Sequence, residues 1–187
     1  RCGIKCQSQQ RSHMNSILII LRGNSGSGKS TIAKGLQHHF GNGTLLIDQD
    51  VVRRNMLSVK DRPNNLSIEL IRQIALYGKG RCEVVIVEGI LNSLKYGEML
   101  KDVIQAFGNQ AVVYYFDLPF EETVNRHETR DKRNRFGEDS LKQWWNPKNF
   151  LQVEGEKAIT ERMTEEQIVQ MVIQDVEQLK KEIHATR

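Results

Sequence analysis

Short apolar runs alternate along the chain with longer segments in which apolar residues recur every three or four positions. The short runs are rich in β-branched side chains, which is typical of parallel strands buried on both faces. The longer segments have the period of amphipathic helices. This alternation predicts an α/β fold with a parallel sheet of about five strands and helices on both faces. Strands are predicted at 17–22, 44–47, 82–87, 111–116 and 157–160, and helices at 30–40, 67–78 and 91–107, from 119 and from 164.

A glycine-rich loop follows the first predicted strand and fits the pattern Gly-x-x-x-x-Gly-Lys-Ser. Its glycines let backbone N–H groups turn inward around a phosphate, and the next helix aims its positive N-terminus at the same anion. Lys29 would bring a cation to the β- and γ-phosphates, and Ser30 a hydroxyl to Mg²⁺. The loop predicts ATP binding by Gly23, Asn24, Ser25, Gly26, Ser27, Gly28, Lys29, Ser30 and Thr31.

Two acidic residues, Asp48 and Asp50, follow the second predicted strand. Acids at the carboxyl end of a strand in an open α/β sheet point into the ligand crevice. One carboxylate there is expected to accept a proton from an attacking hydroxyl, a role given to Asp50, and Asp48 is expected to hold Mg²⁺ through water. Arg53 would share a helix side with Asp50 and bind a polar or anionic acceptor. The alternative is that Asp50 only caps this helix and that Arg53 and Arg54 are solvated.

Glu88 closes the third predicted strand, an arrangement in which a carboxylate supports the metal or its water. Glu88 is therefore a third candidate metal ligand beside Ser30 and Asp48, and a candidate substrate contact beside Asp50 and Arg53. Acidic residues are common in loops, so this prediction depends on the position of Glu88 at the end of a buried strand.

The most basic stretch of the chain follows the fourth predicted strand and includes Arg126, Arg130, Lys132, Arg133 and Arg135. Phosphoryl transfer needs cations over the γ-phosphate, often supplied by a lid that closes and excludes water. Arg130 and Arg133 are predicted to serve in this way. The alternative is an exposed, charged helix end.

Composition and charge limit the class of protein further. Of 187 residues, 39 % are hydrophobic and 27 % charged, as in ordinary globular proteins. Residues 1–13 are polar and aperiodic and end at a possible native start, Met14, so we expect a tag or disordered tail at 1–13 and one domain at 14–187. Without the tail's three cations, 24 basic and 23 acidic residues leave a net charge of +1, which argues against general nucleic-acid binding. Cys82 is then the domain's one cysteine and is expected to pack. No apolar run could cross a bilayer and no signal peptide opens the chain, so a cytoplasmic location is expected.

The chain resembles small P-loop kinases. This resemblance rests on the loop at 23–31, the acids and arginine at 48–53, Glu88 and the arginine-rich segment. This group includes shikimate and gluconate kinases, chloramphenicol phosphotransferase, zeta toxins and the kinase domain of polynucleotide kinase. The resemblance covers nearly all of residues 16–184 and implies a three-layer P-loop NTPase fold with an arginine-rich lid. It also implies that Asp50 acts as base toward the acceptor hydroxyl and that Arg130 and Arg133 contact the triphosphate.

Together these features predict a phosphotransferase that moves the γ-phosphoryl of ATP, with Mg²⁺, to a hydroxyl of a small-molecule acceptor. Lys29, Asp50, Arg130 and Arg133 are its predicted catalytic residues. Two alternatives stay open: a polynucleotide 5′-hydroxyl kinase, which needs a basic groove, and a nucleotide-dependent switch without an acceptor. We expect a monomer or a dimer.

Overall fold

A five-stranded parallel sheet forms the centre of the computed structural model, which describes residues 15–128, 142 and 145–185. Each strand coincides with an apolar run of the sequence. The strands are β1 (Ile17–Gly23), β2 (Leu45–Asp48), β3 (Val84–Gly89), β4 (Ala111–Phe116) and β5 (Lys157–Ile159). The predicted α/β fold with five parallel strands is confirmed.

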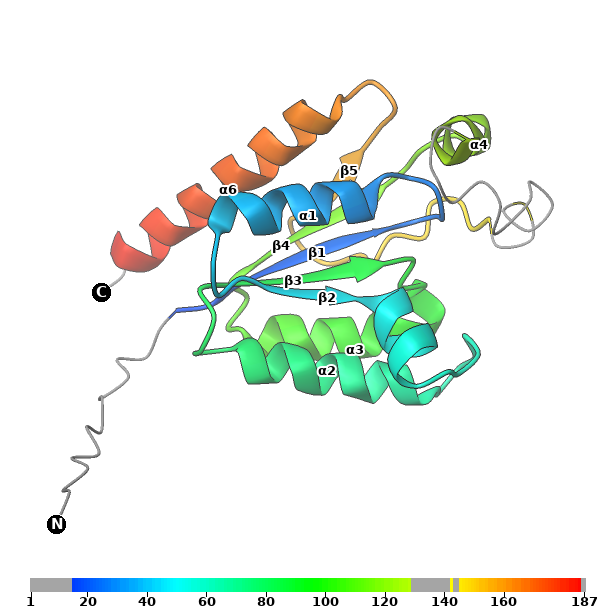
Figure 1. Ribbon diagram of the computed structural model, residues 1–187. Coiled ribbons are helices and arrows are strands. Elements are labelled where there is room, and N and C mark those ends of the chain that lie inside the picture. The colour runs from blue at the N-terminus through cyan, green and yellow to red at the C-terminus, as the bar shows by residue number, and fades with distance from the viewer. Residues whose placement is uncertain (1–14, 129–141, 143–144, 186–187) are drawn as a thin grey trace, which may run out of the picture.

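The strand order is β2-β3-β1-β4-β5, so β1 lies in the middle of the sheet between β3 and β4. Parallel pairing brings the carboxyl ends of all strands to one edge, toward which every arrowhead points in Figure 1. At this edge Arg22 pairs with Gly89 across β1 and β3, and Asp48 pairs with Glu88 across β2 and β3. The phosphate-binding loop and the strand-closing acids are therefore neighbours.

Helices cover both faces of the sheet, as Figure 1 shows. On one face α1 (Lys29–Phe40) and α6 (Glu165–Ala185) pack on the sheet through Leu36, Ile168 and Val172. On the other, α2 (Leu66–Gly78) and α3 (Ser93–Ala106) enclose a second apolar layer with Leu18, Ile20 and Val85. Two further helices, η1 (Val51–Met56) and α4 (Phe120–Glu128), lie toward the carboxyl edge.

Local sequence signals fix several helix ends. Gly41 ends α1 with φ of 79°, in the left-handed region that glycine adopts without strain. Asn65 caps α2 by accepting a hydrogen bond from the Ser67 N–H at 3.0 Å. Thr164 and Gln167 form a capping box ahead of α6, as the spacing Thr-x-x-Gln predicts, each side chain accepting from the other's backbone N–H.

One core prediction is wrong. The helical spacing of apolar residues at 91–107 predicts that Leu94 lies on the core side with Leu100 and Val103, but Leu94 is 90 % exposed. The helix begins only at Ser93, and Leu94 lies one and two turns before the exposed Glu98 and Lys101. The core side of this first turn is instead occupied by Tyr96, which is wholly buried.

None of the helices in the described part of the chain combines the length and apolar character needed to cross a bilayer.

The core assignment predicts a large stability difference between two leucines. Leu36→Ala removes a wholly buried side chain from the α1–α6 layer and should lower the free energy of unfolding by about 2–5 kcal/mol. Leu94→Ala, the same change at an exposed position, should alter it by less than about 0.5 kcal/mol. Urea titrations followed by far-UV circular dichroism measure both. Equal losses would contradict the assignment.

Candidate active site

The phosphate-binding loop joins β1 to α1 and depends on its glycines. Gly23 has φ of +145°, and a Cβ on it would lie 2.8 Å from the Phe116 Cβ and 2.9 Å from the Phe116 carbonyl oxygen. Gly28, the N-cap residue of α1, has φ of 103°. Gly26 also has positive φ, at 80°. The loop therefore holds the tight, glycine-dependent turn that the pattern predicts, against the end of β4.

The ammonium group of Lys29 lies inside this loop. Lys29 is 6 % exposed, and its Nζ donates to the Asn24 carbonyl oxygen at 2.8 Å and to the Ser27 hydroxyl at 3.0 Å. A cation drawn out of water at the start of a helix makes a site suited to an anion. Ser25 and Gly26 are half-buried along the same loop, whereas Thr31 is exposed on α1.

Ser30, Asp48 and Glu88 are brought together beside Lys29. Asp48 and Glu88 are neighbours across β2 and β3, and the Ser30 hydroxyl hydrogen-bonds to the Glu88 carboxyl. Burial raises the pKa of Glu88; the positive charge of Lys29 opposes this shift and Asp48 adds to it. Two carboxyls this close to one another repel when both are charged, and a divalent cation bound beside them would relieve that repulsion.

These three side chains fit Mg²⁺ rather than a metal caged by protein. No group of three His, Cys, Asp or Glu side chains able to hold a metal occurs among the described residues. Mg²⁺ is usually bound by one or two carboxylates together with water and substrate phosphates. Ser30, Asp48 and Glu88 supply the protein's share of such a set, and their role as metal ligands stays a prediction.

Asp48 also determines how the next segment begins. Its Oδ1 accepts hydrogen bonds from the backbone N–H groups of Asp50 at 2.8 Å and Val51 at 3.1 Å, at the start of η1. Asp50 occupies the N-cap position of η1 but makes no capping bond through its side chain. The alternative in which Asp50 serves only as a cap is therefore wrong, because Asp48 does this work.

Asp50 is instead held by two arginines. Its Oδ1 accepts from Arg53 Nη2 at 2.8 Å and lies 3.2 Å from Arg54 Nε. The Asp50 side chain is 52 % exposed, whereas that of Arg53 is 11 % exposed and donates to the Val59 carbonyl oxygen at 3.1 Å. The structure thus presents a carboxylate to solvent with its direction fixed by two cations, one turn along η1. Arg53 is not solvated as the alternative supposed.

The two arginines predicted for a lid, Arg130 and Arg133, lie outside the described residues. Their predicted role stays a prediction.

Sequence reasoning missed two buried polar residues at the same edge, Arg22 and Gln49. Arg22 is 0 % exposed and bonds to the Leu91 carbonyl oxygen, to Asn149 and to Glu156. Gln49 is 3 % exposed and accepts from the Leu91 N–H at 2.9 Å. A charged residue closing an apolar strand just before the loop was the one signal that could have singled out Arg22.

The segment after residue 144 is fastened to the phosphate-binding loop. Asn24 Nδ2 donates to the Asn146 carbonyl oxygen at 3.0 Å, and its Oδ1 accepts from the Asn146 N–H at 2.9 Å. The Tyr115 hydroxyl donates to the same carbonyl at 3.0 Å. Asn24 therefore uses its side chain to bind protein and leaves only its backbone for a nucleotide.

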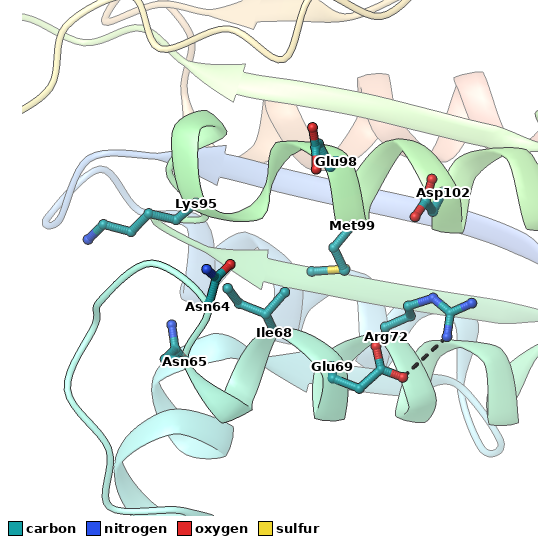
Figure 2. Close-up of a pocket in the computed structure, with 9 residues that line it drawn as sticks. All are labelled: Asn64, Asn65, Ile68, Glu69, Arg72, Lys95, Glu98, Met99 and Asp102. Atoms are coloured by element: carbon teal, nitrogen blue, oxygen red, sulfur yellow. Dashed lines mark hydrogen bonds and ion pairs between the residues drawn. The ribbon is translucent and has the colours of Figure 1, made fainter.

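A separate groove runs between α2 and α3, as Figure 2 shows. Its volume is about 500 Å³, and Met99 points into it while Glu69 and Arg72 form an ion pair at 3.2 Å. Lys95 lies at the other end, where its Nζ donates to the Asp61 carboxylate at 2.8 Å. None of the predicted site residues lines this groove, and its charges are of both signs.

A glycine-dependent phosphate loop at the end of the central strand of a parallel 2-3-1-4-5 sheet defines a P-loop protein with the kinase fold. The family model described as AAA domain (AAA_33) matches residues 18–145. The chain belongs to this family, a group of P-loop kinases.

Similar proteins agree on the fold. A curated relative, adenylyl-sulfate kinase of Clostridium kluyveri, is 34 % identical over 119 residues, which cover 60 % of this chain and 58 % of the relative. A gluconokinase structure from Sinorhizobium meliloti matches with a TM-score of 0.65 and 13 % identity, covering 94 % and 99 % of the two chains. The structure of the Mycobacterium tuberculosis APS kinase in complex with AMPPNP and APS matches with a TM-score of 0.64 and 16 % identity. The match covers 87 % of this chain and 98 % of that one. The chain thus spans less than two thirds of its curated relative, and the structures show the fold alone.

The burial of Glu88 predicts a pH-dependent stability. A raised pKa means that the native state binds the Glu88 proton more tightly than the unfolded chain does. The contribution of Glu88 to the free energy of unfolding is therefore full at low pH and is lost as the pH rises through the native pKa. Glu88→Gln, which is neutral at every pH, should unfold at a higher temperature than wild type at pH 8, and this advantage should shrink toward pH 5.

Calorimetry in EDTA, without nucleotide, measures the effect. Glu98→Gln, at an exposed position on α3, is the matched control and should show no such trend. An advantage for Glu88→Gln that stays constant or falls between pH 5 and pH 8 would contradict the role of burial.

Proposed function

We propose that this protein transfers the γ-phosphoryl group of ATP to a hydroxyl group of a small-molecule acceptor. The observation that carries the proposal is the placement of Asp50. This exposed carboxylate, oriented by Arg53 and Arg54, lies two residues after β2, whose last residue, Asp48, neighbours Glu88 beside the phosphate-binding loop. A nucleotide-binding switch has no need of such a group.

In this proposal Lys29 and the backbone N–H groups of residues 23–31 hold the phosphates. The Lys29 ammonium would exchange its bond to the Asn24 carbonyl for one to a phosphate oxygen, which is stronger because donor and acceptor are then both charged. Ser30, Asp48 and Glu88 would hold Mg²⁺, which neutralises charge on the phosphates.

Asp50 would orient the acceptor hydroxyl and take up its proton as the phosphoryl group is transferred. The two arginines fix the carboxylate in one direction, so the acceptor need not reorganise it. Arg53 is mostly buried and engaged with Val59 and Asp50, so its contribution to acceptor binding would come through the orientation of Asp50. Most of the rate enhancement in such a site comes from positioning and electrostatics.

Support for a small acceptor comes from the relatives. The curated relative is an adenylyl-sulfate kinase, and matching structures include an APS kinase with APS and a shikimate kinase from Acinetobacter baumannii with shikimate. These compounds, with gluconate and other sugar acids, nucleosides and antibiotic alcohols, form the first panel of acceptors to test.

The proposal predicts that Asp50→Asn abolishes acceptor-dependent ADP release while ATP binding is kept. Asparagine retains an oxygen that can accept from Arg53 but cannot take a proton, so turnover should fall by about 10²- to 10⁴-fold. A coupled ADP assay over the panel and calorimetric titration with AMPPNP measure the two effects. Asp102→Asn on the exposed side of α3 is the matched control. Unchanged turnover in Asp50→Asn would remove Asp50 from the mechanism.

A further inference from the structure

The backbone of Leu91, two residues after β3, is held by one side chain from β1 and by another from the residue that follows β2. Its carbonyl oxygen accepts from Arg22 Nε at 3.1 Å and Nη2 at 2.9 Å. Its N–H donates to Gln49 Oε1 at 2.9 Å. Leu91 is 0 % exposed and has φ of 43°, a conformation that a non-glycine residue adopts only when its surroundings impose it.

These bonds begin where the backbone ladder of the sheet ends. The last paired positions are Arg22 with Gly89 between β1 and β3, and Asp48 with Glu88 between β2 and β3. Beyond them, within the described part of the chain, no strand pairing fixes these three segments relative to one another. The Arg22 and Gln49 side chains take over this task, because one comes from β1, the other follows β2, and both bind the segment after β3.

Gln49 is packed tightly enough to hold its position. It is 3 % exposed, and a Cβ on Gly89 would approach Gln49 Oε1 to 2.5 Å and Gln49 Cβ to 2.6 Å. Its side chain also hydrogen-bonds to the Tyr96 hydroxyl, which donates to Asp61 Oδ1 at 2.9 Å. The glycine after Glu88 is therefore required for steric reasons, because only glycine at position 89 leaves room for the Gln49 side chain at the end of β3.

Arg22 is fixed from its other side. Its Nη1 lies 3.2 Å from Glu156 Oε1, and its Nη2 donates to the Asn149 carbonyl oxygen at 3.0 Å. Arg22 directly precedes Gly23, the first residue of the phosphate-binding loop. A shift of Arg22 would therefore move that loop. A shift of Gln49 would in the same way move Asp48 and Asp50, its two neighbours in the sequence.

We propose that Arg22 and Gln49 are positioning residues that set the spacing between the phosphate-binding loop and the carboxylates of Asp48, Asp50 and Glu88. They touch neither phosphate nor acceptor and act through the backbone of Leu91. The inference rests on the proposed function in that these carboxylates serve the metal and the acceptor. Displacement of a reacting group by about 1 Å can cost about 100-fold in rate, so a clamp of this kind is expected to matter.

The test compares Gln49→Met with Gln37→Met. Methionine has nearly the shape of glutamine but cannot accept from the Leu91 N–H. Gln37 donates to the Thr44 carbonyl oxygen at 3.2 Å at the far end of α1, so Gln37→Met removes a comparable bond to the backbone away from the site. Thermal unfolding of both variants measures the purely structural loss.

Three readouts are taken: ADP affinity in EDTA, Mn²⁺ affinity of the ADP complex by electron paramagnetic resonance, and kcat with KM for ATP using the acceptor found in the panel. Gln49→Met should keep its ADP affinity within about twofold, since the phosphate-binding loop is intact, and should lose about 10-fold or more in Mn²⁺ affinity. Its kcat should fall about 10- to 100-fold with KM for ATP unchanged. Gln37→Met should match wild type in all three.

Wild-type Mn²⁺ affinity in Gln49→Met would overturn the proposal, as would an equal loss in Gln37→Met. If Gln49→Met does not fold, Arg22→Lys decides by the same readouts, because lysine keeps a cation beside Glu156 but cannot make both bonds to Leu91. The Mn²⁺ measurement needs no acceptor. Suppose that the wild type transfers phosphate to no compound while Gln49→Met binds Mn²⁺ more weakly. That result would refute the proposed function but support the positioning role of Arg22 and Gln49.

Discussion

A guanidinium group that is removed from water must be surrounded by acceptors, and this requirement at Arg22 organises the carboxyl edge of the sheet. Burial lowers the pKa of Arg22, and the Glu156 carboxylate opposes this shift. Breaking such a buried pair typically costs several kcal/mol. The acceptors come from two separate segments, one at Leu91 and one at 149–156 with Asn149 and Glu156, so the fold cannot satisfy Arg22 without bringing those segments to the end of β1.

The same requirement shapes the candidate active site. Glu156 Oε1 accepts from the Leu151 N–H and Asn149 Oδ1 from the Ser93 N–H, so the stretch at 149–156 is tied to Arg22 and to the start of α3. Asn24 ties the phosphate-binding loop to Asn146 just before it. The result is a hydrogen-bonded frame beside Lys29 and the carboxylates, the kind of support that a site acting by positioning would need.

Features encoded by neighbouring residues could be predicted. The strand, loop and helix at 17–40 follow from an apolar run, a glycine pattern and a helical period that occupy consecutive positions. Asp48 and Glu88 were placed correctly at the sheet edge, since parallel strands bring their carboxyl ends together. The capping role fell to Asp48 rather than to Asp50 because the chain turns helical directly after β2, at residues 49 and 50 ahead of η1, a boundary that residue type does not reveal.

Features that depend on distant partners could not be predicted. Arg22 and Leu91 are 69 positions apart, and Gln49 and Leu91 are 42 apart. Nothing near Gln49 in the sequence shows that its amide will be buried under Gly89. Leu94 was misplaced for a similar reason: helical spacing alone cannot tell where α3 begins, and the first turn decides which side faces the sheet.

The most direct test of this account is a crystal structure of the protein with Mg·AMPPNP. We expect the triphosphate to lie in the loop at 23–31, the Lys29 ammonium to leave the Asn24 carbonyl for a phosphate oxygen, and the metal to lie beside Ser30, Asp48 and Glu88. A nucleotide bound elsewhere, or a Lys29 that keeps its bond to Asn24 while AMPPNP is bound, would contradict the claim that this edge of the sheet is a phosphoryl-transfer site.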